Sequence, residues 1–362
     1  MAPESRSQSR PGRSAGILIY GMYDIASATS APMVRIAMMT AALSRQVHTE
    51  SITGGRLGRA AASFRWLASG GHRRVDAVYV ESATTTSMPT DLAFLAVMRL
   101  LRRPVGVYFR DAYQLFRDVN PRVHRRQILT DWLWRISLPA LRAISSVRYA
   151  PSRGLAEVLG LSDAVILPPG TDPTAPFLGI GQDDLVGAIV QLTPGSGLDT
   201  LVVAMELVRM RRPEARLRIV TRSTGAAAVQ LPSWVDVVAA GRSSLPEALA
   251  AARACVLPLP VNAYTNMAVA VRLLDLLAFG KPVVATDTTE TRAILEASGA
   301  GIVTDGSAEG MAGGILELLG DRAMAERCSA AAQAYAAAPA NTWDARARTV
   351  CRTLGCSQEA TA

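Results

Sequence analysis

Residues Cys255–Thr286 read CVLPLPVNAYTNMAVAVRLLDLLAFGKPVVAT, two apolar runs separated by a polar loop and an amphipathic segment. The apolar runs at 255–257 and 282–286 predict buried strands, and the polar run 262–266 predicts a loop. Apolar residues recur every three or four positions through 266–279, which predicts a helix that Gly280 ends in a left-handed conformation. Strand, loop, helix and strand in this order are typical of a parallel sheet that binds a nucleotide at the carboxyl ends of its strands.

Arg272 and Asp275 lie three positions apart on this predicted helix and therefore on one face of it. A guanidinium and a carboxylate placed there could hold the diphosphate and the ribose of a nucleotide. An ion pair on the surface of an ordinary helix has the same spacing, so the spacing alone leaves both interpretations open.

The same alternation of short apolar runs and helical stretches extends over most of the chain. The predicted strands are 16–20, 76–80, 104–109, 147–150 and 164–167 in the first half, and 186–192, 215–220, 235–239, 255–257, 282–286 and 301–303 in the second. Strands separated by helices predict parallel sheets with both faces covered. We therefore expect an α/β protein with two doubly wound, Rossmann-like domains that face each other across a cleft.

The length of 362 residues also favours two domains, because single cores seldom grow beyond roughly 250–300 residues. Residues 168–176 contain four prolines and one glycine and are the best candidate for a connection. The predicted organisation is a disordered lead-in (1–14), an acceptor-binding N-terminal domain (15–170), a linker (171–182), a nucleotide-sugar-binding C-terminal domain (183–335), and a crossover helix with a tail (336–362).

Charge is distributed unevenly: the first 150 residues contain 21 arginines but only nine acidic residues. This imbalance predicts an anionic partner for the first domain. Aromatic residues are only 5% of the chain and no zinc-finger spacing occurs, so an anionic membrane surface is favoured over nucleic acid. One segment interleaves cations with indoles, as interfacial helices do, although packing of the tryptophans in a core is equally compatible with it; its residues are Arg122, Arg125, Arg126, Trp132, Trp134, Arg135 and Arg142.

No apolar run reaches the roughly 18 residues needed to span a bilayer, and the start lacks the core of a signal peptide. We therefore expect a cytoplasmic protein, with attachment to the inner membrane face as an option. Three histidines and four dispersed cysteines argue against a metal site of nitrogen and sulfur ligands.

Two segments of small or polar residues are candidates for binding a donor molecule. The turn Thr193, Gly195, Ser196 and Gly197 could bring backbone amides close to a phosphate, and a tight turn without a ligand is the alternative. The side chains of Asn262, Tyr264, Thr265 and Asn266 could bind phosphate and sugar hydroxyls, and an ordinary surface loop is the alternative. Gly21, after the first strand, could let a ligand approach the backbone.

In the first half, polar residues follow two predicted strands at the edge that would face the cleft. Arg110, Asp111 and Tyr113 follow one strand, and Glu81 and Ser82 end another. These five residues are the candidates for binding an acceptor, and Asp111 could deprotonate an acceptor hydroxyl. The alternative is an ion pair between Arg110 and Asp111 that only holds a loop in place.

The second half resembles the nucleotide-sugar domain of retaining glycosyltransferases with the GT-B fold, in the large group with glycogen-synthase-like and mannosyltransferase-like members. The resemblance covers roughly residues 185–350, and its motifs are GAIVQLTPGSGLDTL (187–201), LPEALAAA (245–252), LDLLAFGKPVVAT (274–286) and NTWD (341–344). It implies transfer of a sugar from a UDP- or GDP-sugar to a glycan, lipid or small-molecule acceptor. It further implies retention of anomeric configuration, no required metal or other cofactor, and a C-terminal helix that packs back on the first domain.

The chain departs from this family at four positions. Gln191 and Ser196 stand where the family usually has an arginine and a lysine, and Met267 and Asp275 stand where it usually has two glutamates. We expect Arg272 to replace the missing cations, and Arg222 and Arg242 are the next candidates for this role. The predicted catalytic residues are therefore Asp111, Arg272 and Asp275.

Two other functions remain open at this point. A degenerate binding or scaffold protein would keep the fold without turnover. An isomerase that resembles UDP-sugar 2-epimerases would need a histidine and several carboxylates in the cleft, and histidines are scarce in this chain.

Overall fold

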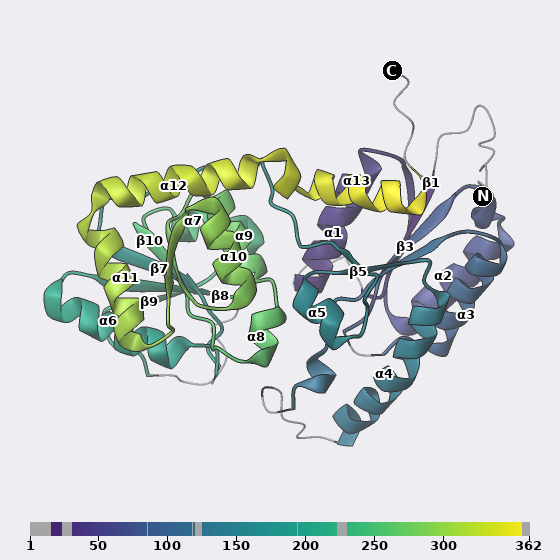
Figure 1. Cartoon of the computed structure of the whole chain (residues 1–362), viewed down its shortest axis with the longest axis horizontal. Coiled ribbons are helices and arrows are strands. Elements are labelled where there is room, and N and C mark those ends of the chain that lie inside the picture. Colours follow the sequence, from purple (N-terminus) through teal and green to yellow (C-terminus); the bar gives the residue numbers. More distant parts are fainter. Residues whose placement is uncertain are drawn as a thin grey trace.

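The computed structural model describes residues 16–23, 31–84, 86–117, 119, 125–193, 195–222 and 230–356, and it forms two α/β domains side by side (Figure 1). The strands of the first domain are β1 (Gly16–Gly21), β2 (His48–Ile52), β3 (Ala77–Glu81), β4 (Val105–Tyr108), β5 (Val147–Ala150) and β6 (Val165–Ile166). Those of the second are β7 (Leu185–Ile189), β8 (Arg216–Thr221), β9 (Val235–Ala239), β10 (Ala254–Leu257), β11 (Val283–Thr286) and β12 (Gly301–Thr304).

Each domain contains one six-stranded sheet in which every neighbouring pair is parallel. The strand orders are β2-β1-β3-β4-β5-β6 and β12-β11-β10-β7-β8-β9. Five inner strands are buried along their whole length because helices cover both faces, namely β1, β3, β4, β10 and β11. The predicted α/β architecture with two Rossmann-like domains is confirmed.

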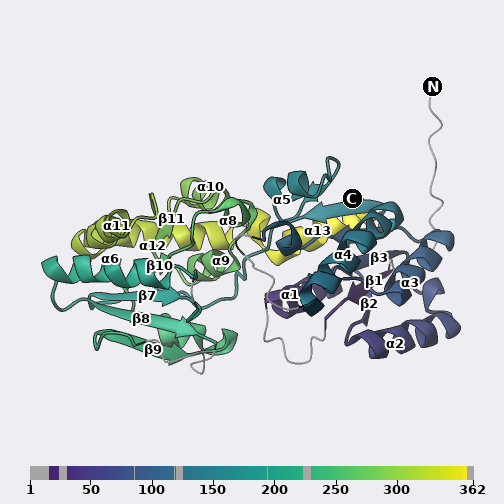
Figure 2. The same ribbon diagram turned by 90° about the horizontal axis from the view of Figure 1, so that it is seen from below.

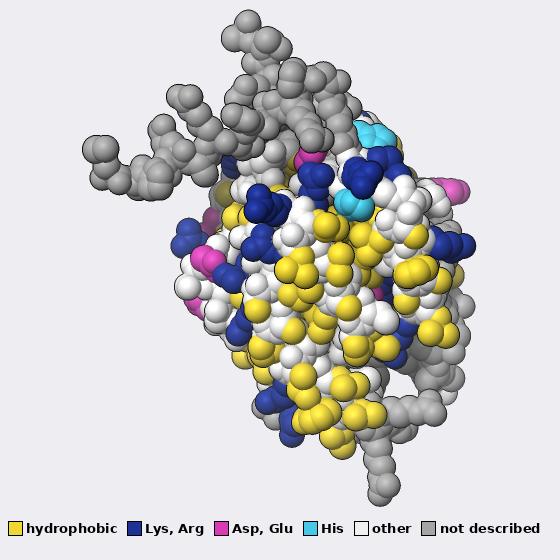
Figure 3. All heavy atoms as spheres, turned by 90° about the vertical axis from the view of Figure 1, so that its right-hand side faces the viewer, with side chains coloured by type: hydrophobic (Ala, Val, Ile, Leu, Met, Phe, Trp, Pro, Cys, Tyr) yellow, Lys and Arg dark blue, Asp and Glu magenta, His cyan; other side chains and the backbone are white. Residues whose placement is uncertain are grey.

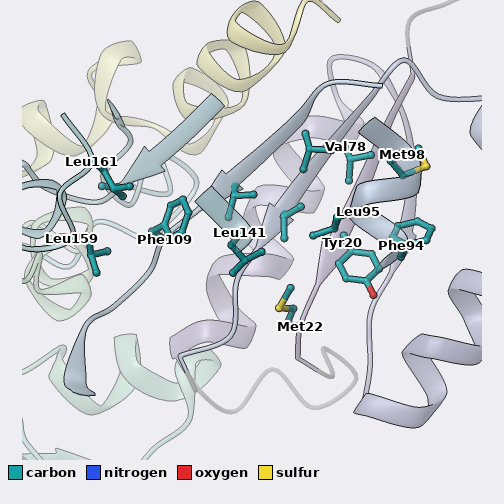
Figure 4. Packing of buried hydrophobic residues seen from close by; sticks show 14 of the residues in the cluster. Tyr20, Met22, Val78, Phe94, Leu95, Met98, Phe109, Leu141, Leu159 and Leu161 are labelled. Atoms are coloured by element: carbon teal, nitrogen blue, oxygen red, sulfur yellow. The ribbon is translucent and has the colours of Figure 1, made fainter. Parts of the chain in front are cut away.

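In the first domain, one face of the sheet is covered by α2 (Arg56–Ala68), α3 (Pro89–Leu100), α4 (Arg125–Ile144) and α5 (Arg153–Val158). Alternate residues of the strands point into this layer, where Tyr20 stacks on Phe94 with 5.0 Å between the ring centroids (Figure 4). The opposite face is covered by α1 (Ala31–Ser44) and by α13 (Trp343–Leu354), a helix from the far end of the chain.

The second domain is built in the same way. Helices α6 (Leu198–Arg211) and α11 (Ala308–Gly320) cover one face of its sheet. Helices α7 (Leu245–Leu249), α9 (Val271–Ala278) and α10 (Thr289–Ser298) cover the other. Figure 2 shows α6 and α11 on the same side of β7, β8 and β9.

The two domains are joined twice. The connection after β6 and the crossing between α12 (Arg322–Ala337) and α13 lie side by side, because Thr171 pairs with Thr342 in an isolated parallel bridge. The Thr171 hydroxyl also donates to the carbonyl of Ala336 at 2.6 Å. Helix α12 follows the second domain and α13 continues onto the first (Figure 1), where Trp343 is buried against its core. The predicted return of the C-terminal helix is confirmed.

Three elements of the first domain were not predicted: β2, α2 and the short helix α5. Strand β2, HTESI, is at the edge of the sheet and buries only Ile52, so it shows no apolar run. Helix α2 begins after Gly55, which has no side chain to cap it, and so the helix lacks the usual start signal. The predicted lead-in 1–14 lies outside the described residues.

The predicted helix 266–279 is confirmed over α9 and at its end, where Gly280 is left-handed with φ +67°, but its start and the predicted loop 262–266 are wrong. Residues Ala263–Met267 form a short helix, α8, and an extended break at 268–270 separates it from α9. The Met267 carbonyl, which would continue the helix, instead accepts a hydrogen bond from the Ser152 hydroxyl of the first domain at 2.5 Å. A contact between domains therefore overrides the local helical pattern.

The first core contains a buried ion pair whose loss we expect to destabilise that domain. Both oxygens of Asp91 bind the Arg59 guanidinium, at 2.8 and 2.7 Å, and the Tyr20 hydroxyl donates to the same carboxylate at 2.7 Å. We predict that Asp91→Asn lowers the free energy of unfolding by about 3–5 kcal/mol, because it leaves a buried guanidinium without its counter-charge.

The matched control is Asp344→Asn, which removes an exposed pair with Arg45 and should cost less than about 1 kcal/mol. Denaturant titration of both variants measures the two losses. Equal losses would show that the buried pair is no more stabilising than a surface pair.

Candidate active site

The candidate site lies where the carboxyl edges of the two sheets meet. Tyr264 on α8 stacks on Tyr113 of the first domain, with 4.5 Å between the ring centroids and 23° between the ring planes. The Tyr264 hydroxyl also donates to a carboxylate oxygen of Asp111 at 3.4 Å. Two candidates for acceptor binding and one for donor binding are thus brought together across the cleft.

Asp111 follows β4 and is the carboxylate best placed for acid–base chemistry. Burial raises its pKa to about 7, against hydrogen bonds from the Ala112 amide and Tyr264 and the charge of Arg110 that lower it. The Ala112 amide donates to one oxygen at 2.8 Å and fixes the carboxylate in place. A carboxyl group with a pKa near neutrality can both accept and release a proton there.

Arg110 does not pair with Asp111. Its guanidinium donates to Glu81 at 2.8 Å, and Arg35 of α1 binds the other oxygen of the same carboxylate at 3.1 Å. The Tyr79 hydroxyl donates to Glu81 as well, at 2.8 Å, and the Glu81 side chain is fully buried. The prediction that Glu81 contacts an acceptor is therefore wrong, because the core already occupies its carboxylate.

Ser82 and Gly21 lie beside this network and are also buried. Ser82 follows Glu81 at the end of β3 and is 5% exposed. A β-carbon at Gly21 would lie 3.0 Å from a methyl group of Thr53 and 3.3 Å from one of Ile36. The packing of these side chains therefore explains the small residue at position 21 without a ligand.

Three arginines converge on the C-terminal half of the cleft. Arg272 on α9 donates to the Ile189 carbonyl at the end of β7, at 2.5 Å. Burial lowers the pKa of Arg272, and the positive charge of Arg222 lowers it further. Arg222, at the end of β8, is exposed. Two like charges that are close enough to interact repel each other, so the arrangement favours an anion between them.

The third arginine, Arg242, forms an ion pair with Asp275, the carboxylate that the sequence predicts to bind a ribose. Its guanidinium lies 2.9 Å from a carboxylate oxygen of Asp275. Burial raises the pKa of Asp275 although the charges of Arg242 and Arg222 lower it. Asp275 therefore pairs with Arg242 and not with Arg272, its neighbour on the helix.

A cavity of about 760 Å³ opens beside this group. Its walls come from both domains: Val34, Ala37, Met38, Asp172, Thr174, Ala175, Pro176, Arg222, Gly241, Arg242, Ser243, Pro246, Asp275, Ala278 and Phe279. The volume is within the usual range for small-molecule sites. Asp172 and the residues of α1 were not predicted, because a proline-rich connection and an ordinary amphipathic helix carry no binding signal.

The small-residue turn lies at the start of α6. Gly197 has φ +84°, and a β-carbon there would lie 1.6 Å from the carbonyl oxygen of Pro258, the residue after β10, so packing against this carbonyl explains the glycine. Gly195 has φ +74°, and no described atom lies within 4 Å of the place that a β-carbon would take, which leaves open space for a ligand. Thr193 is exposed, and the Ser196 hydroxyl is buried without a hydrogen-bond partner in the described part of the chain.

Most of the polar side chains at 262–266 stabilise α8 itself. The Asn262 side chain accepts from the Thr265 amide at 2.9 Å, and the Thr265 hydroxyl donates to Pro260 at 2.5 Å. Asn266 accepts from the Thr289 amide at 3.4 Å. Asn262 and Thr265 thus form a capping box, and Tyr264 is the member of this group that contacts the opposite domain.

Within the described residues, no group of three or more His, Cys, Asp or Glu side chains could hold a metal ion. In the part of the chain that the structure describes, the fold brings these charged side chains to the cleft: Arg222, Arg242, Arg272, Asp111, Asp172 and Asp275.

Comparison with known proteins supports the fold. Residues 184–321, less than half of the chain, match the family model described as glycosyl transferases group 1. No curated protein matches the chain.

Solved structures match over nearly the whole chain. Sucrose-phosphate synthase from Thermosynechococcus elongatus has a TM-score of 0.64 and 15% identity, over 93% of this chain and 98% of that one. HepE of Anabaena, in complex with UDP, has a TM-score of 0.65 and 15% identity, over 94% and 99%. A glycosyltransferase from Rickettsia africae has a TM-score of 0.65 and 11% identity, over 94% and 98%. The chain therefore has the GT-B fold, with a C-terminal domain that matches the group 1 glycosyltransferase model.

Proposed function

We propose that this protein transfers a sugar from a nucleotide-diphosphate sugar to a hydroxyl group of an acceptor. The observation that carries the proposal is the convergence of Arg222, Arg242 and Arg272 with Asp275 at the edge of one sheet, opposite Asp111 from the other. The match of residues 184–321 to the glycosyltransferase model supports the same reaction class.

In the proposed complex the nucleoside occupies the 760 Å³ cavity and its diphosphate lies between Arg222 and Arg272. Asp275, with Arg242 bound to one of its oxygens at 2.9 Å, binds the ribose hydroxyls. Open space at Gly195 lets the backbone approach the phosphates. Guanidinium groups neutralise the leaving group, so the proposed reaction requires no metal ion or other cofactor.

During transfer, the bond between the anomeric carbon and the diphosphate oxygen breaks, and the electron pair leaves with the diphosphate. Negative charge thus develops on the diphosphate, where fixed cations stabilise it more than they stabilise the intact donor. The acceptor oxygen forms the new bond to the anomeric carbon. We assign the acceptor proton to Asp111, whose pKa of about 7 suits an acceptor of protons near neutral pH.

Two structural neighbours of this chain are complexes of HepE with UDP or with UDP and glucose, which supports UDP as the first nucleotide to test. Retention of configuration, a GDP-linked donor and the identity of the acceptor remain parts of the proposal that follow from the resemblance to the family. A cytoplasmic location is likewise proposed.

The first prediction concerns nucleotide binding. Among UDP, GDP, ADP and dTDP, we expect at least one to raise the thermal midpoint of the wild type. Arg222→Gln should weaken its binding about tenfold or more, because one charge-assisted contact to the diphosphate is lost. Arg272→Ala should weaken it at least as much.

Arg222 is exposed, so its substitution tests binding with little effect on folding. The matched control is Arg211→Gln, an exposed arginine at the end of α6, which should leave binding unchanged. Absence of stabilisation by all four nucleotides would favour a protein that keeps the fold without using a nucleotide sugar.

The second prediction concerns pH. If Asp111 must be ionised to take a proton, kcat/KM should rise with pH and level off above about 7, the value to which burial raises its pKa. Asp111→Asn should lower kcat about 100-fold or more and abolish this rise. Release of nucleoside diphosphate from the donor measures both effects.

The Tyr264→Phe variant tests whether the pH profile reports the pKa of Asp111. It removes the hydroxyl that contacts Asp111 but keeps the stack on Tyr113, so the midpoint of the pH profile should move upward without loss of the rise. An Asp111→Asn variant with the pH profile of the wild type would rule out the proposed role of Asp111.

A further inference from the structure

Helices α2, α3 and α4 form one layer over the first sheet, and the outer surface of this layer is unusually apolar. Of the eighteen large hydrophobic side chains that are exposed in the described residues, ten lie on these helices or directly after α3: Leu57, Phe64, Val97, Leu100, Leu101, Ile128, Leu129, Trp132, Leu133 and Ile136. Figure 3 shows a broad hydrophobic area on this side of the first domain, with basic side chains around it. We refer to this surface as the α2–α4 face.

Helix α4 has apolar side chains on two opposite sides. Trp134 and Leu141 point into the core and are 6% and 4% exposed. Ile128, Trp132 and Ile136 follow one another at four-residue steps on the other side, and their exposed fractions are 58%, 59% and 52%. A helix on a protein surface in water normally presents polar groups outward, so the outward stripe indicates a second apolar environment.

The charges of the face identify that environment. Exposed arginines accompany the apolar side chains, namely Arg56, Arg65, Arg99, Arg102 and Arg135. The acidic residues of α2, α3 and α4 are Asp91 and Asp131, and both are buried. The face therefore combines apolar side chains with positive charge and exposes no carboxylate on its three helices.

An anionic lipid bilayer has matching chemistry, with acyl chains for the apolar stripe and phosphate groups for the guanidinium groups. Nucleic acid would match the arginines but not the exposed leucines and isoleucines. A second copy of the same face would bring arginine against arginine. None of the helices in the described residues is long and apolar enough to cross a bilayer, so α4 would lie on the surface of the membrane.

We infer that the α2–α4 face docks this protein on an anionic membrane surface, with Trp132 and its apolar neighbours inserted among the lipids and the arginines at the headgroups. Of the cations and indoles singled out in the sequence, Trp132 and Arg135 lie on this face, whereas Trp134 belongs to the core. Arg122 lies outside the described residues. Docking does not depend on the proposed transferase activity, and the two can fail separately.

The test is co-sedimentation of the full chain with vesicles of phosphatidylcholine alone and of phosphatidylcholine mixed with phosphatidylglycerol. We expect binding to the mixed vesicles, weakened by added salt. Leu129→Ser combined with Trp132→Ser should reduce the partition coefficient about tenfold or more, because two large apolar side chains no longer leave water. Arg99→Gln combined with Arg135→Gln should reduce the preference for anionic vesicles.

The matched control is Met210→Ser combined with Arg211→Gln, an exposed apolar residue and an exposed arginine on α6 of the other domain. This variant should bind as the wild type does, and all variants should keep the thermal midpoint of the wild type. Three results with vesicles would overturn the inference: no binding to mixed vesicles, equal binding to neutral vesicles, or wild-type binding by the Leu129→Ser/Trp132→Ser variant. A fourth is a wild-type dimer, seen by light scattering, that the same two substitutions dissociate.

Discussion

The parallel direction of all strands is the constraint from which the rest of this structure follows. Within each sheet every strand ends at the same edge, so residues that are far apart in the sequence meet there. Asp111 follows β4, Arg222 follows β8, and Arg272 lies in the first turn of α9, between β10 and β11. Because the two domains are joined twice, their edges face each other, and Tyr264 reaches Asp111 across the cleft.

Burial of charge separates the residues of the cleft into two groups. Arg35 and Arg110 both bind Glu81 inside the first domain, and these contacts are part of its stability. Among the described residues no ion pair neutralises Arg222, Arg272 or Asp111, and burial shifts the pKa values of Arg272 and Asp111 towards the neutral forms. Unneutralised groups at the edge of a sheet are free to bind a charged ligand, which is why the proposed function rests on them.

Much of the site could be predicted because its residues follow recognisable strands. Arg272 and Asp275 were found by helical spacing, and Asp111 by its place after a buried run. The prediction failed where a polar side chain has two possible partners. Glu81 and Asp111 both follow apolar strands, yet Glu81 is fully buried among two arginines and a tyrosine. Asn262 and Thr265 look like ligands but cap their own short helix.

The sequence by itself determined the two α/β domains, the positions of most of their strands along the chain and the cationic character of the first half, because these depend on local hydrophobic periodicity and on composition. Only the tertiary structure decided which partner each charge has, where the helix at 263–278 breaks, and which apolar residues of α2, α3 and α4 remain exposed. These outcomes depend on contacts between distant segments, such as Ser152 with Met267 and Arg242 with Asp275, and no spacing along the chain records them.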